Sequence, residues 1–187
     1  MIFFIKNMIE NHNVWKMSIQ RIYDYYSNDC VNIIKSFVER EISVNINQYG
    51  ERIYHLHHCA GHNSKDCLEY LLQLGESPNC KNSNKETPLH YAAHWGSLNC
   101  LKLLLSCEDI DINAQTDGGY TALHMGAMKG RIDIIKCLID SGADITLQCK
   151  KGKTFLEYLN EDLKKEMEEY IQQYDVIASL DIKEPCC

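Results

Sequence analysis

A segment that occurs twice at a fixed spacing restricts the fold of this chain more than any other feature. Residues 87–96 read TPLHYAAHWG and residues 121–130 read TALHMGAMKG, so the two copies begin 34 residues apart. Internal similarity with a period of about 20 to 50 residues is typical of proteins that stack one structural unit on the next. The spacing therefore predicts a row of similar units.

Each copy has the chemistry of a short helix with a defined start and end. The side chain of Thr87 can cap a helix, and Pro88 then takes the first helical position, where its missing N–H costs nothing. Gly96 is suited to end the helix, because glycine readily adopts the left-handed conformation. The apolar stripe at helical spacing between these ends consists of Leu89, Ala92 and Ala93. A second helix is predicted over 98–105.

The letters TPLHYAA match the helical half of the ankyrin repeat, and the chain resembles the ankyrin-repeat family. The positions equivalent to Thr87 are Gln20, Tyr54, Thr121 and Thr154, with successive spacings of 34, 33, 34 and 33 residues. This register gives about five units, at 16–47, 48–81, 82–115, 116–148 and 149–178. The resemblance implies an all-α solenoid of stacked helix-turn-helix units with projecting hairpin-like loops, terminal capping repeats and a concave inner face.

The two ends of the row depart from the pattern in ways that favour capping units. In the fifth unit, Glu168 and Gln172 stand where the fourth unit has Ile135 and Ile139, which predicts the polar outer face that a terminal repeat needs. Residues 1–15 match no unit, so we expect an extra capping helix there, or alternatively an anchor for a partner. Residues 179–187 have no periodicity and are expected to form a disordered tail.

Composition and charge exclude several classes of function. The formal net charge of the 187 residues is −7, which argues against a nucleic-acid partner, because nucleic-acid-binding proteins usually carry a basic stripe. The ten cysteines are scattered, and several fall at core positions of the repeat, so we expect a reducing compartment, cytoplasmic or nuclear. The apolar residues 1–9 are too few to span a bilayer. We expect a monomer without a membrane partner.

Catalytic motifs are missing from the sequence, which contains no phosphate-binding glycine loop, HExxH zinc motif or GxSxG nucleophile elbow. We therefore predict neither an enzyme nor a cofactor. The resemblance implies that His57, His90 and His124, at the motif position, hydrogen-bond to backbone and join adjacent repeats. A buried histidine needs such partners for its ring nitrogens.

Two alternative functions remain open from the sequence. His58 and His62 are four residues apart on a predicted helix, so with His94 of the next unit they could hold a metal ion or form an enzymatic site. The terminal pair Cys186 and Cys187 resembles the ending of some prenylated proteins, which would make the chain a membrane-tethered adaptor.

The leading hypothesis is a non-catalytic module that binds a protein or peptide in the concave groove and at the loop tips. Aromatic and Met side chains are over-represented in binding surfaces, and the variable positions of the inner helices carry several of them. The candidate partner-binding residues are His58, His62, Tyr91, His94, Trp95, Tyr120, Met125, Met128 and Lys129. The alternative for Tyr91 and Trp95 is that both pack between repeats. The other loop-tip candidates are Tyr49, Arg52, Lys85, Glu86, Lys151 and Lys153.

Overall fold

Four helical units follow one another along residues 55–181, the part of the chain that the computed structural model describes, with side chains for residues 55–173. All of them lie in the compact unit Tyr54–Cys187. The pairs are α4 (His55–Gly61) with α5 (Lys65–Gln73), α6 (Pro88–Trp95) with α7 (Leu98–Leu105), α8 (Ala122–Met128) with α9 (Ile132–Asp140), and the 3-10 helix η2 (Phe155–Tyr158) with α10 (Glu161–Asp181).

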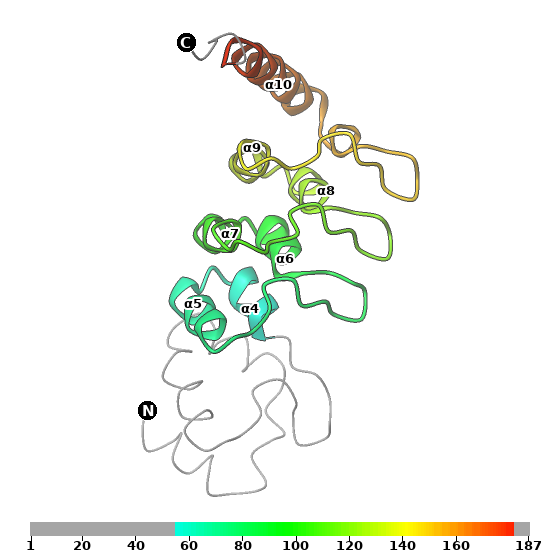
Figure 1. The fold of residues 1–187 in the computed structure, drawn as a ribbon. Helices are drawn as coiled ribbons and strands as arrows, with labels where there is room; N and C mark the ends of the chain where they lie inside the picture. Colours follow the sequence, from blue (N-terminus) through cyan, green and yellow to red (C-terminus); the bar gives the residue numbers. More distant parts are fainter. Residues whose placement is uncertain (1–54, 182–187) are drawn as a thin grey trace, which may run out of the picture. The chain divides into compact units, whose positions relative to one another are not determined.

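The helices stand in two columns, as Figure 1 shows. Helices α4, α6 and α8 form an inner column beside the hairpin loops, and α5, α7 and α9 form the neighbouring outer column. The loops project to one side of the stack, and no strand occurs within residues 55–181. The predicted all-α repeat architecture is therefore confirmed for this part of the chain. The segment 1–15, the first predicted unit at 16–47, Tyr49, Arg52 and residues 182–187 lie outside the described residues.

The inner helices begin and end as the residue chemistry predicts. Thr87 is extended, its backbone N–H donates to Nδ1 of His90 at 3.1 Å, and Pro88 opens α6. Gly96 ends α6 in the left-handed conformation with φ of 79°. In the second unit Asn63 takes this place with φ of 57°, because asparagine tolerates the left-handed region better than most residues. The local sequence thus defines the helix ends of each unit.

The core lies between the two columns and between successive units. Ala92 and Ala93 are fully buried on α6, and such small side chains allow neighbouring helices to approach closely. The larger buried side chains that fill the space around them are Leu68, Leu71, Leu89, Leu101, Leu104, Leu123, Ile134, Ile135 and Leu138. The free cysteines Cys59 and Cys100 are also buried, as expected for small apolar residues, whereas Cys137 is half-buried. Cys67 is buried as well, but it is disulfide-bonded and is not a free thiol.

The fifth unit has the features of a terminal cap. Its first helix is the single 3-10 turn η2, and Glu157, which stands at the motif-histidine position, accepts the backbone N–H of Thr154 at 2.6 Å. Met167 of α10 is fully buried, while Glu168 and Gln172 are exposed. Helix α10 continues to Asp181, three residues beyond the expected domain end at 178.

Candidate binding surface on the inner helices

The three motif histidines join successive units through backbone carbonyl groups. The acceptors of the ring Nε2–H groups are the carbonyl oxygens of Glu86 for His57 at 2.9 Å, of Tyr120 for His90 at 3.0 Å, and of Lys153 for His124 at 3.1 Å. Each acceptor lies in the unit that follows, so the expected joining role of these histidines is confirmed.

The three imidazoles are neutral, and their protonation state fits these bonds. Burial lowers the pKa of His57 to about 4, and it also lowers the pKa of His90 and of His124. In His90 and His124, Nδ1 accepts the N–H of the capping threonine, which leaves Nε2 to carry the proton that is donated to the next unit. The ring nitrogens of these side chains are therefore used in hydrogen bonds that hold the units together.

The remaining histidines do not form the metal site that the sequence left open. Among residues 55–173, no three His, Cys, Asp or Glu side chains are placed so that they could share a metal ion. His58 is half-buried, and its pKa is lowered by burial and by the neighbouring His62, which is exposed. His94 lies against Trp95, with ring centroids 5.1 Å apart in an edge-on arrangement.

Two predicted site residues are held by neighbours within the stack. Tyr91 is half-buried, its ring packs edge-on against His57 at 5.2 Å, and its hydroxyl accepts the Asn82 amide at 3.4 Å. Tyr120 packs edge-on against His124 and Tyr158, with ring centroids 5.9 and 6.0 Å away. Both rings thus support the junctions between units.

Trp95 is the most exposed of the predicted aromatic residues. Its side chain, at the last position of α6, is 60% exposed. A Cβ atom built on Gly61 would lie 3.1 Å from Cδ1 of Trp95, so the indole occupies the space that the missing side chain of Gly61 leaves. Met125 is half-buried on α8, and Met128 at the end of that helix is 37% exposed.

Two cations flank the tryptophan. Lys129 and Arg131 are exposed. Burial is the largest cause that lowers the pKa of His94; Lys129 and Arg131 lower it further, and the carboxylate of Glu86 acts in the opposite direction. The guanidinium of Arg131 lies over Gly96, because a Cβ atom built there would meet Arg131 Nε at 3.1 Å. Within residues 55–173, neither cation takes part in an ion pair.

We call this group, formed by Gly61, His94, Trp95, Lys129 and Arg131, the Trp95 patch. Sequence reasoning included His94, Trp95 and Lys129 among the binding residues but missed Arg131. The available signal was its place two residues after Lys129, just past the turn glycine of the fourth unit.

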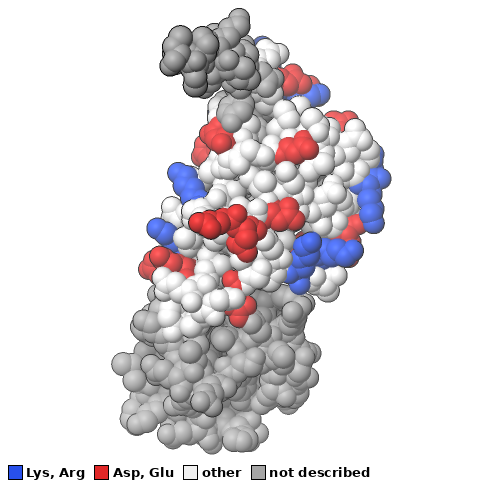
Figure 2. Space-filling view, viewed as in Figure 1, with Lys and Arg blue, Asp and Glu red and all other residues white. Residues whose placement is uncertain are grey.

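The loop tips are linked to one another. The backbone N–H of Asp117 donates to the carbonyl of Asn84 at 2.9 Å, and that of Lys150 donates to the carbonyl of Gly118 at 3.0 Å. Lys85 and Asp117 also form an exposed ion pair at 2.8 Å. Figure 2 shows Lys and Arg side chains over these loops. The predicted second contact row is therefore an ordered, largely basic edge.

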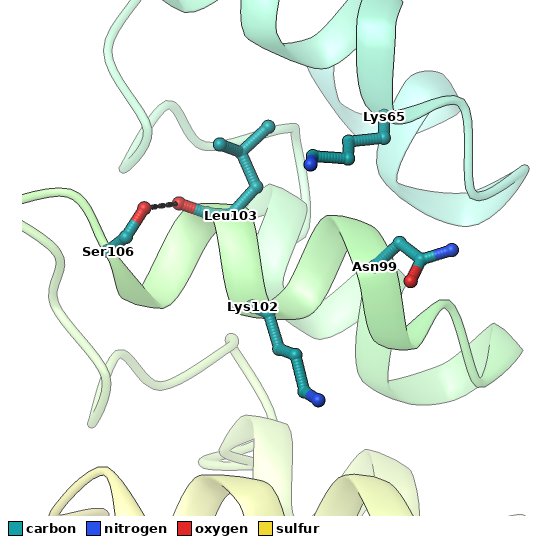
Figure 3. Close-up of a pocket in the computed structure, with 5 residues that line it drawn as sticks. All are labelled: Lys65, Asn99, Lys102, Leu103 and Ser106. Carbon is teal, nitrogen blue, oxygen red and sulfur yellow. Dashed lines mark hydrogen bonds between the residues drawn. The ribbon is translucent and has the colours of Figure 1, made fainter.

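A shallow pocket of about 260 Å³ lies between the outer helices α5 and α7 (Figure 3). Its lining residues are Lys65, Asn99, Lys102, Leu103 and Ser106. The hydroxyl of Ser106 donates to the carbonyl of Leu103 at 2.7 Å. Lys102 extends away from Lys65, so the two ammonium groups do not converge on one point (Figure 3). The sequence did not predict this pocket.

The free thiols of residues 55–173 differ in their pKa. Burial acts to raise the pKa of the Cys149 thiol, but its hydrogen bonds with the Tyr158 hydroxyl and with backbone groups lower it overall. Burial raises the pKa of the Cys59 thiol, and it raises that of Cys100 to about 12, so both groups stay protonated. Among the described helices, none is long and apolar enough to cross a bilayer. The terminal Cys186 and Cys187 lie outside the described residues.

Comparison with known proteins places this geometry among repeat proteins. A family model described as ankyrin repeats, in three copies, matches residues 56–149. The chain is 33% identical over 124 residues to the ANK repeat-containing protein nipk-1 of Caenorhabditis elegans, covering 58% of this chain and 20% of that protein. It is 44% identical over 68 residues to human ankyrin repeat domain-containing protein 29, covering 34% of this chain and 23% of that protein.

A third relative carries an enzyme name. The chain is 47% identical over 57 residues to palmitoyltransferase akr1 of Schizosaccharomyces pombe, which covers 30% of this chain and 9% of that protein. The chain thus spans less than a quarter of the length of each of these three relatives.

Proposed function

Because the chain belongs to the ankyrin-repeat family, we propose that it is a non-catalytic module that binds a protein or peptide partner on the exposed face of its inner helices. Ankyrin repeats generally mediate protein–protein interaction. The observation that carries the proposal is the exposure of Trp95 and Met128, at 60% and 37%, on that face. Exposed tryptophan is a residue type in which binding free energy is often concentrated.

The stacked architecture supports binding by a surface that is formed in advance. The histidine bonds join each inner helix to the following unit, and the hairpin tips are joined by backbone hydrogen bonds. A surface that is already ordered loses less conformational entropy when a partner binds. The partner can therefore gain affinity from a small number of side chains.

A non-catalytic function agrees with the state of the three motif histidines and of two buried thiols. His57, His90 and His124 use their ring nitrogens to hold the stack, and the buried thiols of Cys59 and Cys100 are protonated. No observation within residues 55–173 favours the alternative metal site.

The proposal is tested by affinity capture from cells, using the full chain and its Trp95→Ala and Met128→Ala variants. Partners held by the inner helices should be recovered at least about tenfold less with Trp95→Ala, as expected for the loss of a binding hot spot. The thermal midpoint should hardly change, because substitutions of exposed side chains usually alter stability by less than about 0.5 kcal/mol.

Leu74→Ala is the matched control, because Leu74 is 42% exposed but follows the outer helix α5. Recovery of the same partners should be unaffected by this change. Equal recovery with wild type and Trp95→Ala would contradict the proposal, and so would unfolding of both inner-face variants, since it would make those residues part of the core.

A further inference from the structure

The chemistry of the Trp95 patch indicates what kind of partner fits it. We propose that the patch binds an acidic peptide segment, whose carboxylates pair with Lys129 and Arg131 while an adjacent apolar side chain covers the Trp95 indole. This inference rests on the proposed function and specifies its partner.

Charge complementarity is the first argument. Lys129 and Arg131 have no ion-pair partner among residues 55–173, and Lys85 and Lys136, in contrast, each pair with a carboxylate. Arginine presents a planar fork of N–H groups that matches a carboxylate with two parallel hydrogen bonds. A partner that supplies carboxylates would therefore satisfy groups that the described part of the chain leaves without a counter-charge.

The position of the guanidinium is the second argument. Arg131 is the N-cap residue that precedes α9, and it extends over Gly96, at the end of the helix that carries Trp95. Because glycine has no side chain, the guanidinium lies close to the backbone there, next in sequence to the exposed indole. One ligand can therefore contact the cation and the ring together.

The overall acidity of the chain does not oppose this binding. Of the formal net charge of −7, residues 157–187 contribute nine acidic and three basic side chains, or −6. Interactions between exposed charges are largely screened beyond about 8 Å at physiological ionic strength. The local cations of the patch therefore determine its electrostatic preference.

A peptide fits the patch better than a single-stranded nucleic acid. Proteins that bind single strands stack successive bases on several aromatic rings along a basic groove. The exposed large apolar side chains within residues 55–173 are Leu74, Trp95 and Met128, so Trp95 is the one Phe, Trp or Tyr ring that this part of the chain exposes to this degree. A short acidic segment with one apolar side chain matches one ring and two cations.

The test uses a random twelve-residue peptide library displayed on phage and panned on the immobilised full chain. Retention of the enriched peptides is then compared on Trp95→Ala, on the double variant Lys129→Ala/Arg131→Ala, and on the control Lys65→Ala/Lys102→Ala. The control removes the same charge from the exposed outer-helix pocket. Circular dichroism shows whether each variant folds. If the double variant Lys129→Ala/Arg131→Ala does not fold, the single variant Lys129→Glu replaces it.

The expected result is a set of peptides rich in Asp and Glu with one large apolar residue. Their retention should fall at least about tenfold on Trp95→Ala and on the double variant, in line with the loss of charge-assisted hydrogen bonds, and stay unchanged on the control. A synthetic copy with Gln in place of Glu and Asn in place of Asp should bind at least about tenfold more weakly.

Other results would overturn the inference, and they distinguish its failure from failure of the proposed function. One such result is a set of peptides whose retention depends on Trp95 but which are not enriched in Asp and Glu. Another is a set whose retention is unchanged on the double variant Lys129→Ala/Arg131→Ala. Either would refute the acidic partner but not the proposed binding surface. If no peptide is enriched, or if retention of the enriched peptides is unchanged on Trp95→Ala, the acidic partner and the proposed binding surface are both refuted. Tighter binding of a twelve-nucleotide oligo-dT than of the acidic peptide would assign the patch to nucleic acid.

Discussion

Each motif histidine forms contacts in two units at once, and neutral imidazole has the groups that this requires. In His90, Nδ1 accepts the N–H of Thr87 in its own unit while Nε2–H donates to the carbonyl of Tyr120 in the next. Any replacement for this histidine would need both a hydrogen-bond acceptor and a donor, separated as Nδ1 and Nε2 are in the imidazole. The motif histidine therefore stabilises both the start of its own helix and the contact with the next unit.

Replacing His90 with Ala should destabilise the protein strongly. The change leaves the buried N–H of Thr87 without its acceptor, and the carbonyl of Tyr120 keeps only the N–H of Thr116 as a donor. An unsatisfied buried group costs about 1–3 kcal/mol and a lost hydrogen bond about 0.5–1.5 kcal/mol, so the free energy of unfolding in urea should fall by about 1.5–4.5 kcal/mol. His94→Ala, on the exposed patch, is the control and should change it by less than about 0.5 kcal/mol. Similar losses for the two variants would refute the structural role.

Equivalent hairpin loops keep one backbone shape although their sequences differ. Lys85, Gly119 and Gly152 stand two residues before the threonine of their units, with φ of 59°, 76° and 70°. The third unit therefore places a lysine in the left-handed region that glycine occupies in the fourth and fifth. Side chains with a Cβ atom are disfavoured there, which makes this loop a strained copy of the same element.

Exchanges at the loop position should act in opposite directions. Lys85→Gly should raise the urea midpoint, because relief of the left-handed backbone outweighs an exposed ion pair with Asp117. Gly119→Ala should lower it, since its Cβ atom would lie 2.9 Å from the backbone nitrogen of Lys150 in the next loop. Equilibrium unfolding measures both. A drop in the midpoint for Lys85→Gly would mean that the ion pair matters more than backbone strain.

At the scale of the whole molecule, the histidine junctions make the stack sensitive to acid. The pKa of His57 is lowered to about 4 by burial, and the pKa values of His90 and His124 are lowered for the same reason. In the unfolded chain, histidine titrates near its ordinary pKa of about 6.5. Between these values the unfolded chain binds more protons than the folded one, so stability rises with pH.

The buried histidines should therefore make their full contribution to the free energy of unfolding above about pH 6.5. This contribution should decline as the pH falls towards 4. Urea unfolding at about pH 7.5, 6.5, 5.5 and 4.5 measures the decline. The variant His90→Gln removes one of the titrating groups and should show a shallower decline. A midpoint that stays constant from pH 7.5 to 4.5 would refute the linkage.

Much of the fold follows from local chemistry. The period and the helix pairs are predicted because caps, apolar stripes and turn residues act within a few positions of one another. The joining role of the motif histidines is what the resemblance to the ankyrin-repeat family implies. The left-handed conformation of Asn63 has the same local origin, because asparagine tolerates it better than most residues. The register also grouped His94, Trp95 and Lys129 on one surface.

The sequence by itself thus determined which positions face inward, and only the tertiary structure decided what each side chain does there. Tyr91 packs against His57 in the preceding unit, whereas Trp95, four residues later, stays 60% exposed beside Gly61. Arg131 became part of the patch because it reaches over Gly96 of another unit. The physical reason is that exposure depends on the size and charge of side chains about one repeat away, which the pattern within a single unit does not contain.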